Sequence, residues 1–202
     1  MKNILFLSML CFAFSTSCTS KSKKSPAAEA IPMTQFARDS VKVVASLSKI
    51  YKSISEPDLT QFMFESYRFN YLDSFGNHRL FRIEHHNDRD IRLIVKYYDQ
   101  DGSYESETYS VKSEHVIQLK SEQYNQFIKL LKGAYFWDLQ MLETLQPMYL
   151  DGYGYLLEGF EPNRPKQNYH IVGRSVPHDG SFAQACEKLA EFYDEEKSNS
   201  LN

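Results

Sequence analysis

Apolar and polar residues alternate with a period of two along much of the middle of this chain, which is the pattern of β-strands that bury one face. Turn residues separate the alternating runs and keep their connections short, so neighbouring strands are expected to run antiparallel. The runs predict four strands, at 67–71, 80–85, 91–97 and 108–120.

A β-hairpin is predicted further along the chain, over 149–177. Two prolines interrupt its middle segment 161–166, and proline lacks the N–H that a strand ladder needs, so this segment is the expected loop. The alternation on the two arms predicts one apolar face, formed by Tyr155, Leu157, Tyr169 and Ile171. On the other face we expect three polar side chains to converge, those of Glu158, His170 and Arg174.

Three segments show the period of an amphipathic helix, with apolar residues three and four positions apart: 34–55, 121–133 and 181–197. For the first of them, packing into the core is the simpler interpretation, and a docking helix for a partner is the alternative. The elements together predict one α+β domain at 33–197, in which a single antiparallel sheet of five to six strands has the helices packed on one face.

The N-terminus has the form of a secretion signal at 1–18, in which Lys2 precedes an apolar run too short to span a bilayer. The run ends in small residues and Cys18, which resembles a bacterial lipobox whose cysteine is lipidated; simple cleavage is the alternative. Thr19 rather than Asp after the cysteine indicates the outer membrane in a Gram-negative cell. We therefore expect an outer-membrane lipoprotein that faces the periplasm and is held by lipid at Cys18.

A flexible tether is predicted at 19–32, because Ser, Lys, Ala and Pro dominate and large apolar groups are too few to offset the entropy of ordering. A disordered tail is expected at 198–202. Between them, Cys186 lies alone on the apolar stripe of the last helix, so we expect a small buried hydrophobe and no internal disulfide.

Composition narrows the range of partners. The formal net charge is −3, with acidic and basic residues interspersed, so no nucleic-acid partner is expected. The chain holds 14 tyrosines and 14 phenylalanines. Tyrosine is favoured where one end of a side chain is apolar and the other wet, so these residues suit a sheet face that binds an envelope protein, and equally the rim of an ordinary core.

The polar cluster of the hairpin is the candidate for chemistry. A carboxylate beside an imidazole can set its tautomer and raise its pKa, which general acid–base catalysis would use, with Glu158 and His170 as the pair. The alternative is a structural network that satisfies a partly polar sheet face. The structural network is the favoured interpretation, because no nucleophile stands at a fixed spacing from these residues.

Neither a metal nor a cofactor is predicted. His85 and His86 are adjacent, so on a strand they point to opposite faces and cannot share an ion. The segment 99–110 resembles a calcium loop, but Ser110 stands where such loops carry a Glu, so an Asp-Gly turn is the better interpretation.

Several short motifs in a fixed order resemble a family of uncharacterised bacterial proteins, many of them described as lipoproteins. The likeness spans about 66–193. Its motifs are Tyr67-Arg68-Phe69, Ser74-Phe75, Phe136-Trp137, Asp151-Gly152, Leu157-Glu158-Gly159, Tyr169-His170, Val172, Arg174 and Pro177. Tyr155 and Ser175 depart from the family, which has tryptophan at both places. The resemblance implies a lipid anchor and no particular activity.

The function predicted from the sequence is a lipid-anchored envelope protein that is not an enzyme and binds another protein through its sheet or a tyrosine-rich surface. One alternative is an immunity lipoprotein that neutralises a secreted toxin. The other is an enzyme that uses Glu158 and His170.

Overall fold

The structure is a computed structural model that describes residues 35–73, 76–102, 108–141, 153–175 and 180–199, with the backbone alone for 35–42 and Ser175. The predicted leader, its Cys18 and the tether lie outside the described residues, as do residues 103–107 of the calcium-like segment and the last residues of the predicted tail.

Six strands form one open sheet in which every neighbouring pair is antiparallel. The strands are β1 (Glu65–Asp73), β2 (His78–Asn87), β3 (Asp90–Gln100), β4 (Tyr109–Gln118), β5 (Tyr153–Phe160) and β6 (Tyr169–Ser175). Their order across the sheet is β4-β3-β2-β1-β5-β6, so the hairpin β5–β6 joins the four-stranded meander through β1. The predicted single antiparallel sheet is confirmed.

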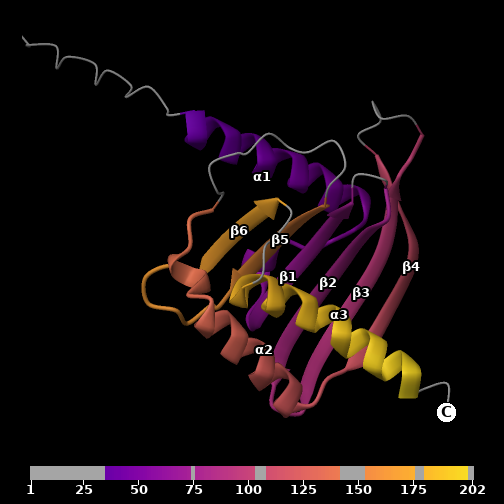
Figure 1. Cartoon of the computed structure of the whole chain (residues 1–202), viewed down its shortest axis with the longest axis vertical. Coiled ribbons are helices and arrows are strands. Elements are labelled where there is room, and N and C mark those ends of the chain that lie inside the picture. The colour runs from indigo at the N-terminus through magenta and orange to yellow at the C-terminus, as the bar shows by residue number, and fades with distance from the viewer. Residues whose placement is uncertain (1–34, 74–75, 103–107, 142–152, 176–179, 200–202) are drawn as a thin grey trace, which may run out of the picture. The chain divides into compact units, whose positions relative to one another are not determined.

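Three α-helices in the described part of the chain complete the α+β fold, in the predicted order: α1 (Gln35–Ser53), α2 (Ser121–Gly133) and α3 (Ser181–Asn199). Two short 3₁₀ turns, η1 (Leu59–Gln61) and η2 (Phe136–Asp138), follow α1 and α2. Figure 1 shows α2 and α3 lying across the same face of the sheet.

The opposite face of the sheet carries α1, which differs from the prediction that the helices share one face. Leu47 and Tyr51 of α1, and Ile54 directly after it, pack with Leu80, Tyr98, Leu156 and Ile171 in a cluster separate from the one beneath α2 and α3. The inner strands bury apolar side chains on both faces, as Leu80 and Phe81 do on β2. A strand of this kind needs a covering layer on each side.

The register of the hairpin also differs from the prediction. Phe160 pairs with Tyr169 and Gly159 with His170, so the loop holds an even number of residues. An even loop places each odd-numbered residue of one arm opposite an even-numbered residue of the other, and directly opposite residues share a face. Tyr155 and Leu157 therefore face α2 and α3, while Tyr169 and Ile171 face α1.

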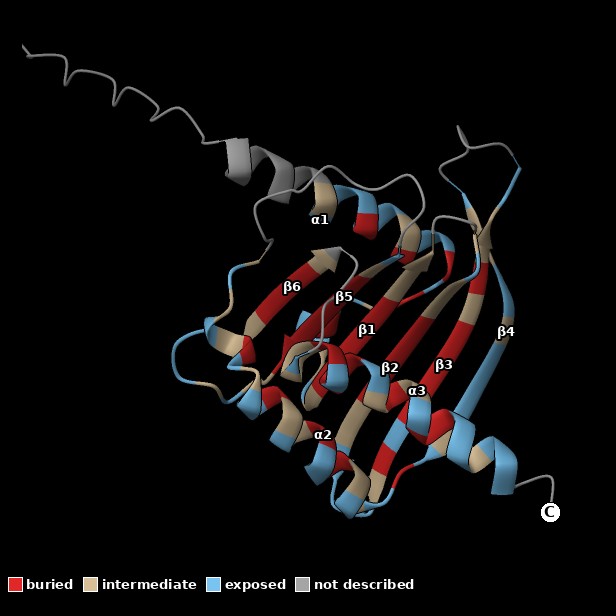
Figure 2. Cartoon of the chain, viewed as in Figure 1, coloured by how far each residue is buried: buried red, intermediate tan, exposed pale blue. Residues whose placement is uncertain are grey.

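The two edges of the sheet are finished differently. At β6, the N–H of Gly173 donates to the carbonyl of Met141 at 2.7 Å, so the segment after η2 covers that edge. At β4, the ladder shifts between Ser113 and Val111 and leaves Lys112 as a bulge, which weakens the strand as a template for another chain. Figure 2 shows the central strands largely buried and β4 largely exposed.

Candidate functional site

The three polar residues predicted to converge are divided between the two faces of the sheet, so that prediction is wrong. Glu158 is directly opposite Ile171 and faces α1. His170 is opposite Gly159 and contacts the ring of Phe136, on the face that carries α2 and α3. Arg174 lies on that face as well, with its guanidinium 5.6 Å from the ring of Phe182.

Glu158 is paired with an arginine of the neighbouring strand. Arg68 lies directly opposite it on β1, and its Nε and Nη2 donate to the two carboxylate oxygens at 2.9 and 2.8 Å. The hydroxyl of Tyr169 donates to the same carboxylate at 2.8 Å, and the hydroxyl of Tyr51 donates from α1. Both charged side chains are only 3% exposed. The pair is therefore buried, and its carboxylate accepts four hydrogen bonds, as a stable buried ion pair requires.

Donated hydrogen bonds extend this network across the sheet. Tyr98 donates to the Asn70 side-chain oxygen at 3.1 Å, and the Asn70 amide donates to the hydroxyl of Tyr51 at 2.8 Å. Burial first, and then the negative charge of Glu158, raise the pKa of Tyr51 well above its ordinary value. The hydroxyl of Tyr51 therefore stays protonated and remains a donor to Glu158.

A second group of buried charges lies beside the first on the same face. The carboxylate of Glu56 contacts Arg82, the Nζ of Lys96 at 2.9 Å and, more distantly, Arg68 at 3.6 Å. Arg82 also pairs with Glu84 at 3.0 Å. The cations Arg68, Arg82 and Lys96 are thus each paired with at least one of the carboxylates of Glu56, Glu84 and Glu158, and Lys96 also lies 3.6 Å from the exposed carboxylate of Glu114.

A pocket of about 330 Å³ opens between α1 and the hairpin above this network. Apolar side chains such as Leu47 and Ile171 line it, and Arg68 and Glu158 lie in its lining. Both carboxylate oxygens of Glu158 already accept two hydrogen bonds, and Arg68 Nη1 donates to the carbonyl of Pro57 at 2.8 Å. The acceptor positions of Glu158 and three donors of Arg68 are therefore used within the protein, and the arrangement is that of a structural clamp between α1 and the sheet.

His170 fastens the segment after η2 to the edge of the sheet. Its Nε2 lies 3.0 Å from the carbonyl of Leu139, and Gln167 Nε2 lies 2.9 Å from its Nδ1. These contacts fit a neutral imidazole that donates from Nε2 and accepts at Nδ1. Burial lowers the pKa of His170, which favours the same neutral form. Arg174 adds a bond to the carbonyl of Gln140 at 3.2 Å.

An open pocket of about 390 Å³ lies between α2, η2 and the adjoining ends of β1 and β5, and we call it the aromatic pocket. The sequence analysis did not predict this pocket. The sequence features that could have indicated it are the pair Phe136-Trp137 and the charged loop after β5. The lining of the pocket includes Glu65, Tyr124, Tyr135, Trp137, Glu161 and Arg164.

Buried tyrosines hold two carboxylates in the lining of the aromatic pocket. The hydroxyl of Tyr67 donates to Glu161 at 2.5 Å, and the hydroxyl of Tyr124 donates to Glu65 at 2.6 Å. Burial first, and then the bonded carboxylate, raise the pKa of both tyrosines, so they stay protonated. The side chains of Glu161 and Glu65 are 23% and 44% exposed. The carboxylates are therefore oriented by the core and still reach solvent.

Aromatic rings complete the pocket. Trp137 stacks on His170 with ring centroids 6.0 Å apart, and the guanidinium of Arg164 lies over the Trp137 ring, 4.3 Å from its centroid. Arg164 Nη1 is 3.4 Å from Glu161 Oε2. Tyr135 is 72% exposed and adopts a left-handed backbone with φ 52°. A non-glycine residue in that region is uncommon and marks a site worth testing for function.

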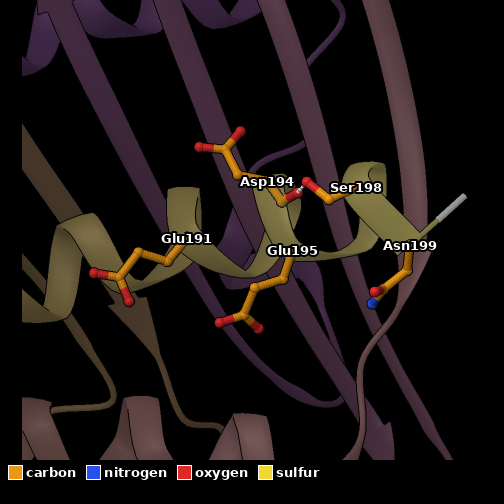
Figure 3. Close-up of a pocket in the computed structure, with 5 residues that line it drawn as sticks. All are labelled: Glu191, Asp194, Glu195, Ser198 and Asn199. Carbon is orange, nitrogen blue, oxygen red and sulfur yellow. Dashed lines mark hydrogen bonds between the residues drawn. The ribbon is translucent and has the colours of Figure 1, made fainter. Parts of the chain in front are cut away.

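A third hollow lies along the last turns of α3 and is lined by exposed residues. Figure 3 shows the carboxylates of Glu191, Asp194 and Glu195 pointing in different directions, with Ser198 bonded to the backbone carbonyl of Asp194 at 2.8 Å. Within the described residues, no three His, Cys, Asp or Glu side chains are placed to hold one metal ion. This hollow is an acidic helix surface.

No protein-family model matches the chain, and no curated protein matches it significantly. The resemblance to a lipoprotein family therefore stays a prediction. Within the described part of the chain, no helix is long and apolar enough to cross a membrane.

Proposed function

We propose that this chain is a lipid-anchored binding protein of the bacterial envelope, held at the outer membrane through Cys18 and facing the periplasm, which uses the aromatic pocket to bind another protein. The leader and its cysteine support the anchor. The pocket supports the binding function.

The observation that carries the proposal is the contrast between the two charged regions. In the cluster beneath α1, Arg68 and Glu158 are buried and hydrogen-bonded to each other. In the aromatic pocket, Glu65 and Glu161 are oriented by tyrosines yet remain accessible, and the exposed residue Tyr135 lines the same pocket. Aromatic side chains and arginine, which Tyr135, Trp137 and Arg164 supply in this pocket, are enriched at the centres of protein interfaces.

The enzyme hypothesis loses its geometric basis, because it required Glu158 and His170 to face one another. The sheet lies between their side chains, and each has a different partner, Arg68 for Glu158 and the carbonyl of Leu139 for His170.

A pull-down from envelope extract tests the proposal. The bait is the purified protein, in wild-type form and with Tyr135→Ala, and Met63→Ala is the matched control because Met63 is also a large exposed side chain, 90% accessible, outside the pocket. We expect wild type and the control to retain the same stoichiometric partner and the Tyr135 variant to lose it. Recovery of no such partner by any bait would contradict the proposal. A secreted toxin as the retained partner would assign the immunity function.

A further inference from the structure

The aromatic pocket already holds a cation that the protein itself supplies. The guanidinium of Arg164, from the loop between β5 and β6, lies over the ring of Trp137 and beside the carboxylate of Glu161. A cation over an aromatic face and next to a carboxylate is the arrangement by which proteins recognise basic side chains.

We propose that the aromatic pocket binds a basic side chain, arginine or lysine, of the protein partner, and that Arg164 is an internal occupant which this side chain displaces. The inference rests on the proposed function and adds the chemistry of the ligand.

The charge of the lining favours a cation. Its acidic residues are Glu65, Asp138 and Glu161, and its basic residues are Lys132 and Arg164, so displacement of the Arg164 side chain leaves an excess of negative charge. Hydrogen bonds donated by Tyr67 and Tyr124 fix the orientation of two of these carboxylates, those of Glu161 and Glu65. A pocket that is net negative and walled by aromatic rings is suited to an ammonium or guanidinium group.

Arg164 is held loosely enough to leave. Its side chain is 33% exposed, and its 3.4 Å contact with Glu161 is long for a charge-assisted hydrogen bond. The backbone is fixed independently, because the N–H of Arg164 donates to the carbonyl of Glu161 at 3.1 Å and the N–H of Glu161 donates to the carbonyl of Asn168 at 2.8 Å. The side chain can therefore swing out while the loop keeps its shape.

The single tryptophan of the chain gives a direct readout, because that residue is Trp137 itself. The purified protein is titrated with N-acetyl-arginine amide, and binding is followed by Trp137 fluorescence and by calorimetry. The neutral isostere N-acetyl-citrulline amide is the ligand control. We expect saturable binding of the arginine compound and none of the citrulline compound.

Three variants separate the internal-occupant model from other arrangements. Glu161→Gln keeps an acceptor for Tyr67 and should weaken binding about fivefold, as expected for an exposed cation contact. Arg164→Gln removes the competing cation and should tighten binding about two- to fivefold. Glu195→Gln on α3 neutralises an exposed carboxylate outside the pocket and should change nothing. Melting temperatures confirm that each variant is folded.

The inference would be overturned if the citrulline compound bound as tightly as the arginine compound. It would also be overturned if the arginine compound bound neither the wild-type protein nor the Arg164→Gln variant. Loss of binding in Arg164→Gln would also overturn it, because Arg164 would then be part of the ligand contact. Failure here is distinct from failure of the proposed function. A partner retained in the pull-down without arginine binding leaves the proposed function standing, and arginine binding without any retained partner contradicts only the proposed function.

Discussion

Replacement of Arg68 by methionine should destabilise the protein strongly, because it leaves the carboxylate of Glu158 buried without its counter-ion. Arg68 supplies two of the hydrogen bonds to that carboxylate and a third to the carbonyl of Pro57. Breaking a buried pair by removing one partner costs about 3–5 kcal/mol. The hydroxyls of Tyr51 and Tyr169 still donate to Glu158, so we expect the lower end, about 3 kcal/mol.

At this chain length each kcal/mol lowers the melting temperature by about 2–4 °C, so Arg68→Met should melt about 6–12 °C below wild type. Thermal unfolding followed by circular dichroism measures the change. Arg92→Met is the matched control, since Arg92 also makes two 2.8 Å bonds to an aspartate, Asp90, on the same sheet but is solvent-exposed. The control should melt close to wild type.

A double-variant cycle tests whether Arg68 acts through Glu158. With Glu158→Gln already in place, Arg68→Met no longer leaves a buried charge without its counter-ion. The double variant should therefore lose less unfolding free energy than the two single variants lose in sum, by more than about 1 kcal/mol. A strictly additive cycle, or a melting temperature for Arg68→Met within about 2 °C of wild type, would refute the clamp that joins α1 to the sheet.

Three further predictions concern other parts of the molecule. Burial holds the pKa of His170 in the folded protein below its value of about 6.5 in the unfolded chain. Between these two pKa values the unfolded state binds more protons than the folded state. Stability should therefore fall as pH is lowered through this window, and denaturant unfolding of His170→Gln should show a shallower pH dependence; an identical slope would contradict this role. Gly159→Ala places a Cβ 2.8 Å from the Phe136 ring, so urea unfolding should show that the free energy of unfolding falls by about 1–3 kcal/mol. Unchanged stability would mean that the rings of Phe136 and Tyr67 move aside at no cost. Cys18→Ala should release the protein from the membrane fraction on cell fractionation, and retention there would exclude a lipid anchor at this residue.

The elements of the fold could be predicted from the sequence because each has a local periodicity. Alternation marked β1, β2 and β3, and three- and four-residue spacing marked α1, α2 and α3. Local periodicity also marks which residues share a face of one strand. It does not say which residues of two strands are opposite, and that is where the prediction for the hairpin was wrong.

The partner of Glu158 depends on pairing between distant parts of the chain. Arg68 is 90 residues away, and the two meet because β1 inserts between β2 and β5. Alternation placed Arg68 on a strand but could not place that strand beside β5. The aromatic pocket is equally non-local, because it joins Glu65 at the start of β1 to Trp137 and to Arg164 after β5. Sites built from such separate elements are assembled by topology, which a single sequence does not state.

Site-specific photo-crosslinking in intact cells tests most directly whether an envelope protein binds over the aromatic pocket. A photoreactive amino acid is placed at Asn125, an exposed residue in the lining of the pocket, and in a control at Glu195 on α3. Binding at the pocket predicts one discrete adduct from position 125 and none of that size from position 195. The same adducts from both positions would contradict binding at the pocket. So would the absence of any adduct from position 125 in cells whose membrane fraction contains the protein.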